Sequence, residues 1–151
     1  MEYIIFIKII YMKVFQKEFN LPAHHRGFHL ITKLVLARIP DIKQIEIGML
    51  QVFIKHTSAS LTINENADPT VRQDFQSHMD RMVPENAPYY KHTYEGADDM
   101  PAHIKASLMG TSVQIPISKG ALNLGIWQGI YLCEHRDHAR ERTIVVTAIG
   151  I

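Results

Sequence analysis

The chain has 151 residues, of which 46% are hydrophobic and 21% charged, a composition typical of one soluble globular domain with a buried core. The formal net charge is +1 and no run of basic residues stands out, so the charge pattern gives no support to a nucleic-acid partner. The single cysteine, Cys133, excludes an intrachain disulfide and is compatible with the reducing cytoplasm, where we expect the protein.

The first eleven residues, MEYIIFIKIIY, are apolar but lack the features of a targeting or membrane segment. They are too few to cross a bilayer, include Glu2 and Lys8, and have no basic start or small-residue cleavage site. We therefore expect no membrane partner. Residues 1–11 are either an extension upstream of an alternative start at Met12 or an extra edge strand, and residues 12–151 form one domain.

The first third of the chain mixes strand and helix patterns. Residues 14–21 alternate loosely before Pro22 and predict a strand. Apolar residues at helical spacing from 30 to 38 predict a helix that ends at Pro40. Residues 45–54 are rich in β-branched side chains and predict a buried strand, and we expect residues 61–64 to pair with it.

Two further helices are indicated by their start and stop signals. Asp68-Pro69 is a capping carboxylate followed by a first-turn proline, and this helix should end near Pro84. The other helix should run from Asp98-Asp99 to Gly110. The apolar stripe of the first, which we expect to be mostly core, comprises Val71, Phe75, Met79 and Met82. The remaining expected strands are residues 112–117, 122–126, 129–134 and 143–149.

The order of these elements predicts the fold class. Strands joined by turns, with about three isolated helices and no regular βαβ repeat, indicate an α+β domain. We expect a single domain with a mostly antiparallel, β-sandwich-like core.

The segment His56–Pro69, HTSASLTINENADP, carries an unusual density of polar side chains beside a predicted buried strand. Buried polar side chains need hydrogen-bond partners, so this segment is a candidate rim of a ligand site. The alternative interpretation is a polar strand end followed by a helix cap.

Histidines and carboxylates gather at several places along the chain. Asp99 and His103 are four residues apart in a predicted helix and so share one face, where the carboxylate can orient the imidazole; a capping aspartate near an exposed histidine is the alternative. The four clusters that compete as sites are His56 with Asn64 and Glu65, His92 with Glu95, Asp98-Asp99 with His103, and Glu134-His135-Arg136 with His138.

These clusters allow a divalent metal. His56, His103 and His135 come from separate segments and would form an open zinc site if the fold brings them together. Asp98-Asp99 is the one acidic pair suited to magnesium. Arginines near the last strand, Arg136 and Arg142 among them, are candidates for holding phosphate or are simply solvated.

Trp127-Gln128 lies between two glycines, Gly125 and Gly129. A tryptophan in this setting can pack against a ring-shaped ligand or a subunit contact, with Gln128 donating and accepting hydrogen bonds, or it can belong to the core.

Three blocks together resemble the YjbQ-like family, whose members have been called secondary thiamine-phosphate synthases. The blocks are HTSASLTINENAD at residues 56–68, HIKASL at 103–108 and GIWQGIYLCEHR at 125–136, in the family's order and spacing. The family's usual G-T-W-Q tetrad reads G-I-W-Q here, so Ile126 stands where the family has a threonine hydroxyl.

This resemblance implies a compact α+β domain that forms a homotrimer and joins hydroxymethylpyrimidine diphosphate to thiazole phosphate with release of pyrophosphate. The partner would be a small phosphorylated heterocycle and the cofactor a divalent metal, zinc or magnesium, with His103 and His135 as its ligands. Together with the residue patterns, it leads us to expect catalytic roles for His56, Glu65, His103, His135 and Arg136. The expected substrate-binding residues are Thr57, Ser58, Asn64, Asp99, Gln128, Glu134 and Arg142.

Two other functions stay open. One is metal-assisted hydrolysis of a phosphate or amide by the histidine cluster. The other is a non-catalytic trimeric module that binds a metabolite or a metal.

Overall fold

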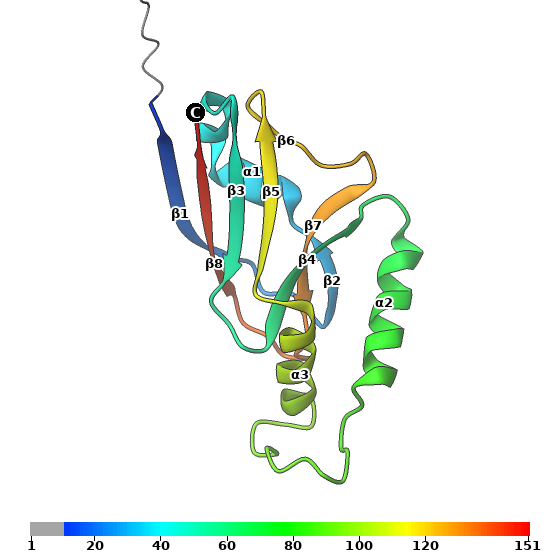
Figure 1. Ribbon diagram of the computed structural model, residues 1–151. Helices are drawn as coiled ribbons and strands as arrows, with labels where there is room; N and C mark the ends of the chain where they lie inside the picture. The colour runs from blue at the N-terminus through cyan, green and yellow to red at the C-terminus, as the bar shows by residue number, and fades with distance from the viewer. Residues whose placement is uncertain (1–10) are drawn as a thin grey trace, which may run out of the picture.

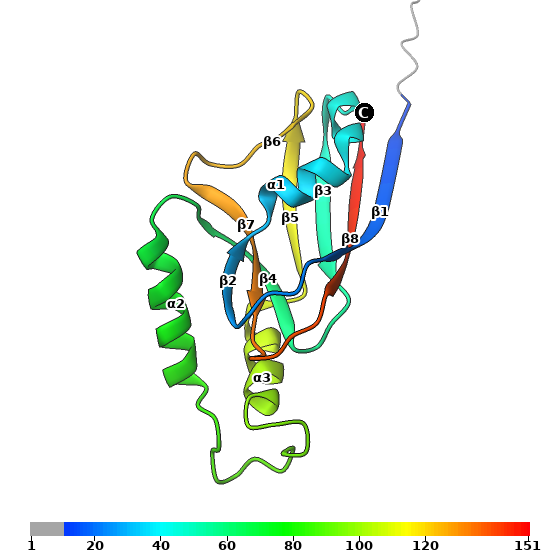
Figure 2. The same ribbon diagram turned by 180° about the vertical axis from the view of Figure 1, so that it is seen from behind.

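The computed structural model describes residues 11–151, so the extension or extra strand expected at residues 1–11 lies, apart from Tyr11, outside the described residues. The described chain forms two antiparallel sheets, three α-helices and one short 3-10 helix (Figures 1 and 2). The α+β, single-domain prediction is therefore confirmed. None of the helices in residues 11–151 is both long and apolar enough to cross a membrane.

The larger sheet has five strands in the order β1-β8-β3-β5-β6. Their inward side chains are branched apolar residues such as Val52 and Ile115, which are fully or almost fully buried. The strand bounds are β1 Lys13–Leu21, β3 Ile47–Ile54, β5 Ser112–Ser118, β6 Ala121–Leu122 and β8 Arg142–Gly150.

The smaller sheet has three strands in the order β2-β7-β4, with bounds β2 Gly27–Leu30, β7 Gln128–Glu134 and β4 Ala59–Glu65. The prediction that β4 pairs with the preceding strand is wrong. Both edges of β3 are already occupied by β8 and β5, so β4 pairs instead with β7, from Ala59 opposite Glu134 to Glu65 opposite Gln128.

One helix closes the main core. Helix α1, Thr32–Arg38, crosses a face of the five-stranded sheet and is followed by the 3-10 helix η1, Pro40–Gln44 (Figure 2). Ile31, Val35 and Ile39 are completely buried in the same cluster as Leu50 and Ile144. The helix begins later than the sequence suggests, because Leu30 is the last residue of β2 and pairs with Tyr131.

The other two helices lie beside the smaller sheet, α2 (Pro69–Met82) against β2 and α3 (Asp99–Met109) against β4 (Figure 1). The predicted cap of α2 is confirmed, because the Asp68 carboxylate accepts hydrogen bonds from the Thr70 amide at 2.8 Å and the Thr70 hydroxyl at 2.7 Å. Those two bonds also lower the pKa of Asp68.

Two expectations about packing need correction. The apolar stripe of α2 is not mostly core, because only Met79 is buried and the Met82 side chain is 51% exposed. The helix contacts the sheet along one edge, where Phe75 packs on Phe28. The strand expected at residues 122–126 is also wrong, since β6 ends at Leu122 and a loop with an exposed Ile126 follows.

Candidate functional site

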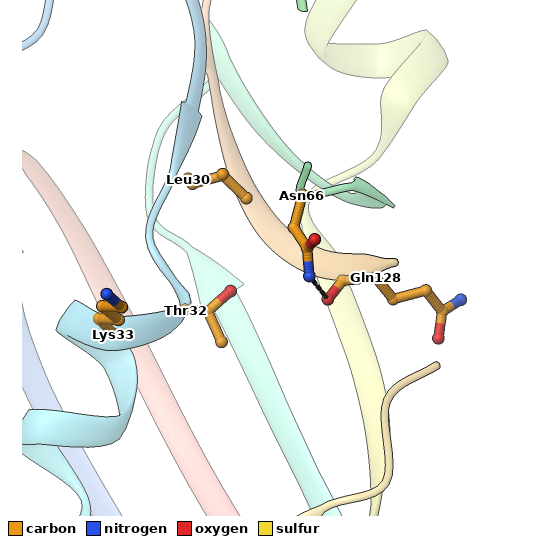
Figure 3. Close-up of a pocket in the computed structure, with 5 residues that line it drawn as sticks. All are labelled: Leu30, Thr32, Lys33, Asn66 and Gln128. Carbon is orange, nitrogen blue, oxygen red and sulfur yellow. Dashed lines mark hydrogen bonds between the residues drawn. The ribbon is translucent and has the colours of Figure 1, made fainter. Parts of the chain in front are cut away.

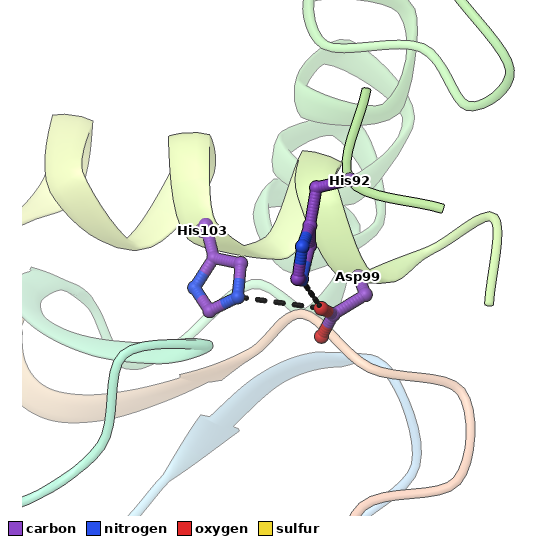
Figure 4. A group of neighbouring side chains, drawn as sticks. All are labelled: His92, Asp99 and His103. Atoms are coloured by element: carbon purple, nitrogen blue, oxygen red, sulfur yellow. Dashed lines mark hydrogen bonds and ion pairs between the residues drawn. The ribbon is translucent and has the colours of Figure 1, made fainter. Parts of the chain in front are cut away.

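Three side chains converge where α3 begins. Asp99 Oδ2 lies 2.7 Å from His92 Nε2 and 3.3 Å from His103 Nε2 (Figure 4). One donor atom from each residue lies within 4.8 Å of the others, close enough for all three to share a metal ion. This is the one such group of three or more His, Cys, Asp or Glu side chains among residues 11–151.

The local structure explains two of the three positions. Asp99 is in the first turn of α3 and His103 is four residues later, so the helix puts them on the same face, as predicted. The Asp99 side chain is only 1% exposed, whereas His92 and His103 are 45% and 32% exposed. The cluster therefore has a buried carboxylate behind two imidazoles that solvent can reach.

The orientation of His103 is set by its other ring nitrogen. Nδ1 lies 3.0 Å from the Thr57 carbonyl oxygen, which can only accept a hydrogen bond, so Nδ1 carries a proton. In a neutral ring the lone pair then lies on Nε2, which faces the Asp99 carboxylate. A lone pair that faces a carboxylate oxygen repels it, so this contact is stabilised by a cation or a proton between the two atoms. Histidine metal ligands are commonly held in this way through a carbonyl.

Arg136 fixes the carboxylates of the same site. Its guanidinium donates to Asp98 Oδ2, to Asp99 Oδ1 and to the Glu95 carbonyl, so it joins the end of β7, the start of α3 and the preceding loop. Burial by itself would raise the pKa of Asp98, but hydrogen bonds from the Asp137 amide and Arg136 outweigh it and lower that pKa. Asp98 is thus held as an anion.

His56 does not join this cluster. Its Nε2 accepts the Thr143 amide at 2.8 Å, and its Nδ1 lies 3.4 Å from Arg142 Nη1. Burial and the charge of Arg142 both lower the pKa of His56. Arg142 itself forms a two-pronged ion pair with the buried Glu134, with both distances 2.7 Å.

His135 is also separate from the three-residue group. Its Nε2 lies 2.8 Å from the buried Ser60 hydroxyl, and its side chain is buried. Burial and, after it, the charges of Lys105 and Arg142 lower the pKa of His135 to about 3, so the ring is neutral. The condition for a zinc site of His56, His103 and His135, that the fold brings them together, is therefore not met within one chain, because tertiary contacts give each of the three a different partner.

The other predicted site residues divide between the two ends of the small sheet. Thr57, Ser58, Glu134 and Arg142 lie at the end near the cluster, and Asn64, Glu65 and Gln128 at the opposite end. Seven residues of extended strand span about 20 Å, so one chain does not place both sets around one small molecule. At the far end each amide or carboxylate oxygen accepts a nearby backbone N–H: Asn64 from Glu65, Glu65 from Asp68 and Gln128 from Gly125.

His92 is the residue to which sequence reasoning assigned no role. It lies in the loop between α2 and α3, seven residues before Asp99, and no helical or strand spacing connects the two. The only sequence signal is its place in a polar cluster with Glu95.

Comparisons with known proteins agree on one family. The family described as UPF0047 protein YjbQ-like matches residues 17–151. The UPF0047 protein YjbQ of Escherichia coli O157:H7 is 51% identical over 136 residues, covering 90% of this chain and 98% of that protein. The UPF0047 protein YugU of Bacillus subtilis is 40% identical over 103 residues, covering 68% of this chain and 75% of that protein.

Solved structures have the same fold. A crystal structure of an uncharacterised YjbQ/UPF0047 family protein from Clostridium acetobutylicum is 45% identical, with a TM-score of 0.76 over 86% of this chain and 97% of that one. A YbjQ-like protein of unknown function from Sulfolobus solfataricus has a TM-score of 0.82 over 93% of this chain and 100% of that one. At 24% identity, the second likeness concerns the fold alone.

Proposed function

The chain belongs to the UPF0047 family of YjbQ-like proteins, and from that premise we propose that it is a metal-dependent enzyme acting on a small phosphorylated heterocycle. The observation that carries the proposal is the convergence of His92, Asp99 and His103, with the ring of His103 oriented by the Thr57 carbonyl. The proposal includes a cytoplasmic location and assembly as a homotrimer.

The ligand types favour zinc over magnesium. Two imidazoles and one carboxylate suit a transition metal, whereas magnesium prefers oxygen ligands and retains several waters. Three protein ligands leave a coordination position for water or substrate, which is typical of catalytic zinc sites. Asp98 and Arg136 then act as supporting groups, since Arg136 holds the carboxylate of Asp99 in place.

Two buried cations lie near the site, and each is neutralised by a carboxylate. Lys105 and Arg142 are both buried near His135, where their positive charges add to the effect of burial on its pKa. Lys105 is paired with Asp80 and Arg142 with Glu134, so neither cation is free to bind a phosphate, and the proposed metal is the group that would attract an anionic substrate.

The reaction that we propose first is thiamine-phosphate synthesis. The thiazole nitrogen forms a bond to the methylene carbon of hydroxymethylpyrimidine diphosphate, the carbon–oxygen bond breaks, and diphosphate leaves with the electron pair. The bound metal would supply a Lewis acid that stabilises the departing diphosphate. No proton leaves the thiazole, so the neutral, buried His135 is not needed as a base, and Arg136 keeps Asp99 in position through the reaction.

The test measures metal content and product together. Metal-stripped and zinc-reloaded protein would be supplied with both thiamine precursors, and we expect thiamine phosphate only from the reloaded protein. His92→Ala and His103→Ala should lose the zinc and at least about a hundredfold of the activity, because each removes a proposed ligand. His138→Ala, an exposed histidine outside the cluster, is the matched control. Equal activity without metal would contradict the metal proposal, and product no greater than that of His103→Ala would remove the synthase assignment.

Metal-assisted hydrolysis is the second candidate, because the exposed edges of His92 and His103 leave the cluster open to water. Release of inorganic phosphate from p-nitrophenyl phosphate by zinc-loaded protein, lost in His103→Ala, would favour it. Tight zinc binding with no turnover in either assay would favour the non-catalytic metal-binding module instead.

A further inference from the structure

A cavity lies at the opposite end of the small sheet from the histidine cluster. Its volume is about 480 Å³, within the usual range of small-molecule sites. Residues from the β2–α1 segment and from the ends of β4 and β7 surround it, namely Leu30, Thr32, Lys33, Asn66 and Gln128 (Figure 3).

Hydrogen bonds hold the polar walls of this cavity in place. The Asn66 side-chain amide donates to the carbonyl oxygens of Gln128 and Ile126, and the Asn66 backbone N–H donates to Trp127. The oxygen of the Gln128 side chain accepts from the Gly125 amide at 2.8 Å. Thr32 Oγ1 accepts from the Ile130 amide at 2.8 Å, which ties α1 to β7.

Three polar groups of the cavity-lining residues remain available to bind a ligand. Within residues 11–151, no hydrogen bond or ion pair engages Asn66 Oδ1, Gln128 Nε2 or the Lys33 ammonium group. The cavity therefore offers one fixed acceptor, one fixed pair of donors and one cation beside the apolar side chain of Leu30. A ligand that matches this set has a flat polar edge and a negative charge.

A glycine, Gly129, lies against three of the residues that line the cavity. A Cβ on Gly129 would lie 2.7 Å from Leu30 Cδ2, 3.1 Å from Asn66 Cβ and 3.3 Å from Thr32 Oγ1, all three in cavity-lining residues. A side chain here would crowd the space that these residues enclose. Trp127, whose carbonyl is bonded to Asn66, presents a 61% exposed indole next to Gln128.

We propose that this cavity is a binding site for a small planar heterocycle carrying an anionic group, of which a nucleoside monophosphate is an example. Asn66 and Gln128 hydrogen-bond the edge of the ring, Leu30 packs on its apolar surface, and Lys33 pairs with the anion. The site lies about 20 Å from the histidine cluster along β7. It does not depend on the metal or on the activity proposed for that cluster.

The chain is suited to a direct binding measurement because Trp127 is its only tryptophan. Metal-free full-length protein would be titrated with AMP, adenosine and ribose 5-phosphate, following tryptophan fluorescence and heat of binding. We expect AMP to bind saturably. Adenosine lacks the phosphate and ribose 5-phosphate lacks the base, so we expect each of them to bind about tenfold or more weakly than AMP. Absence of saturable AMP binding by both methods would overturn the proposal.

Two variants of the cavity and two control variants locate the site. Lys33→Met should weaken AMP binding about tenfold or more and leave adenosine binding unchanged, whereas Lys17→Met, an exposed lysine on β1, should change neither. Gly129→Ala, checked for folding by circular dichroism, should weaken both ligands. His103→Ala should bind AMP as the unmodified protein does. If His103→Ala abolishes AMP binding, or if Lys33→Met leaves it unchanged, the ligand binds elsewhere and the proposal fails.

Discussion

At the scale of single residues, the histidines show how surroundings decide the role of one side chain. The Nδ1–H of His103 donates to the Thr57 carbonyl, and its Nε2 faces the Asp99 carboxylate. This arrangement attracts a cation. His135 is buried beside Ser60, in surroundings made positive by Lys105 and Arg142, which exclude a proton. The two residues were indistinguishable as metal ligands in the sequence.

The lowered pKa of His135 predicts acid sensitivity. An unfolded histidine binds a proton near pH 6.5, whereas the folded His135 does so only near pH 3, so this group's contribution to stability is complete above pH 6.5 and is lost as pH falls toward 3. Between about pH 5.5 and 4.5 the free energy of unfolding should fall by about 1 kcal/mol more in the unmodified protein than in His135→Gln. Urea unfolding at a series of pH values measures both slopes, and parallel slopes would show that His135 titrates normally.

At the scale of secondary-structure elements, α3 organises the metal cluster and its surroundings. Its first turn supplies Asp99, its second supplies His103, and Arg136 ties its start to the end of β7. The helix ends at Gly110, whose N–H donates to Ala106 and whose carbonyl accepts from Leu61 of β4. The end of the helix therefore also fixes its position on the small sheet.

A substitution at Gly110 tests whether the backbone conformation at the end of α3 requires glycine. Its φ of 101° and ψ of 162° lie in a region that is almost exclusive to glycine, and a Cβ there would meet no atom within 4 Å. Gly110→Ala should therefore cost about 1–3 kcal/mol of unfolding free energy from backbone strain alone. Gly125→Ala, where φ is not positive, is the matched control and should cost less in the same urea titration. Equal costs would show that strain at Gly110 is not the cause.

At the scale of the whole molecule, one face of the five-stranded sheet is covered by α1 and the other is exposed. Apolar side chains cross that outer face in register, from Val14 through Ile149 and Met49 to Pro116 on four adjacent strands. Phe53 and Ile47 on the same face are 41% and 65% exposed. A polar row of Gln16, Thr147, Gln51 and Gln114 lies in register between this apolar row and Phe53. Exposed apolar side chains grouped on one sheet face in this way are candidates for a subunit interface.

We expect this face to be buried in the proposed homotrimer. Light scattering with size-exclusion chromatography should give a mass three times the 17.3 kDa of one chain. Met49→Lys should reduce that mass, because a charge would be buried without a partner. Leu108→Lys changes an exposed leucine on α3 and should leave the assembly intact. A monomer mass for the unmodified protein would contradict the trimer, and an unchanged mass for Met49→Lys would place the interface elsewhere.

Local patterns in the sequence determined most of the elements. Proline and aspartate marked the start of α2, glycine marked the end of α3, and the four-residue spacing put Asp99 and His103 on one face. These features depend on backbone sterics and hydrogen bonds among neighbours along the chain, so they can be read from composition and spacing. The same local reasoning indicated the α+β class and the family resemblance.

Contacts between segments far apart in the sequence decided the strand pairing and the grouping of the site residues. Pairing of β4 with β7 follows from competition among strands for the edges of β3, which no local pattern records. His92 reaches Asp99 because the α2–α3 loop folds back, and His56 and His135 are kept apart from it because Thr143 and Ser60 bind their rings. Hydrogen bonds between residues far apart in the sequence, and the burial of those residues, depend on how the whole chain packs. For that reason the candidate residues can be identified from the order of amino acids, whereas the contacts among them depend on the folded chain.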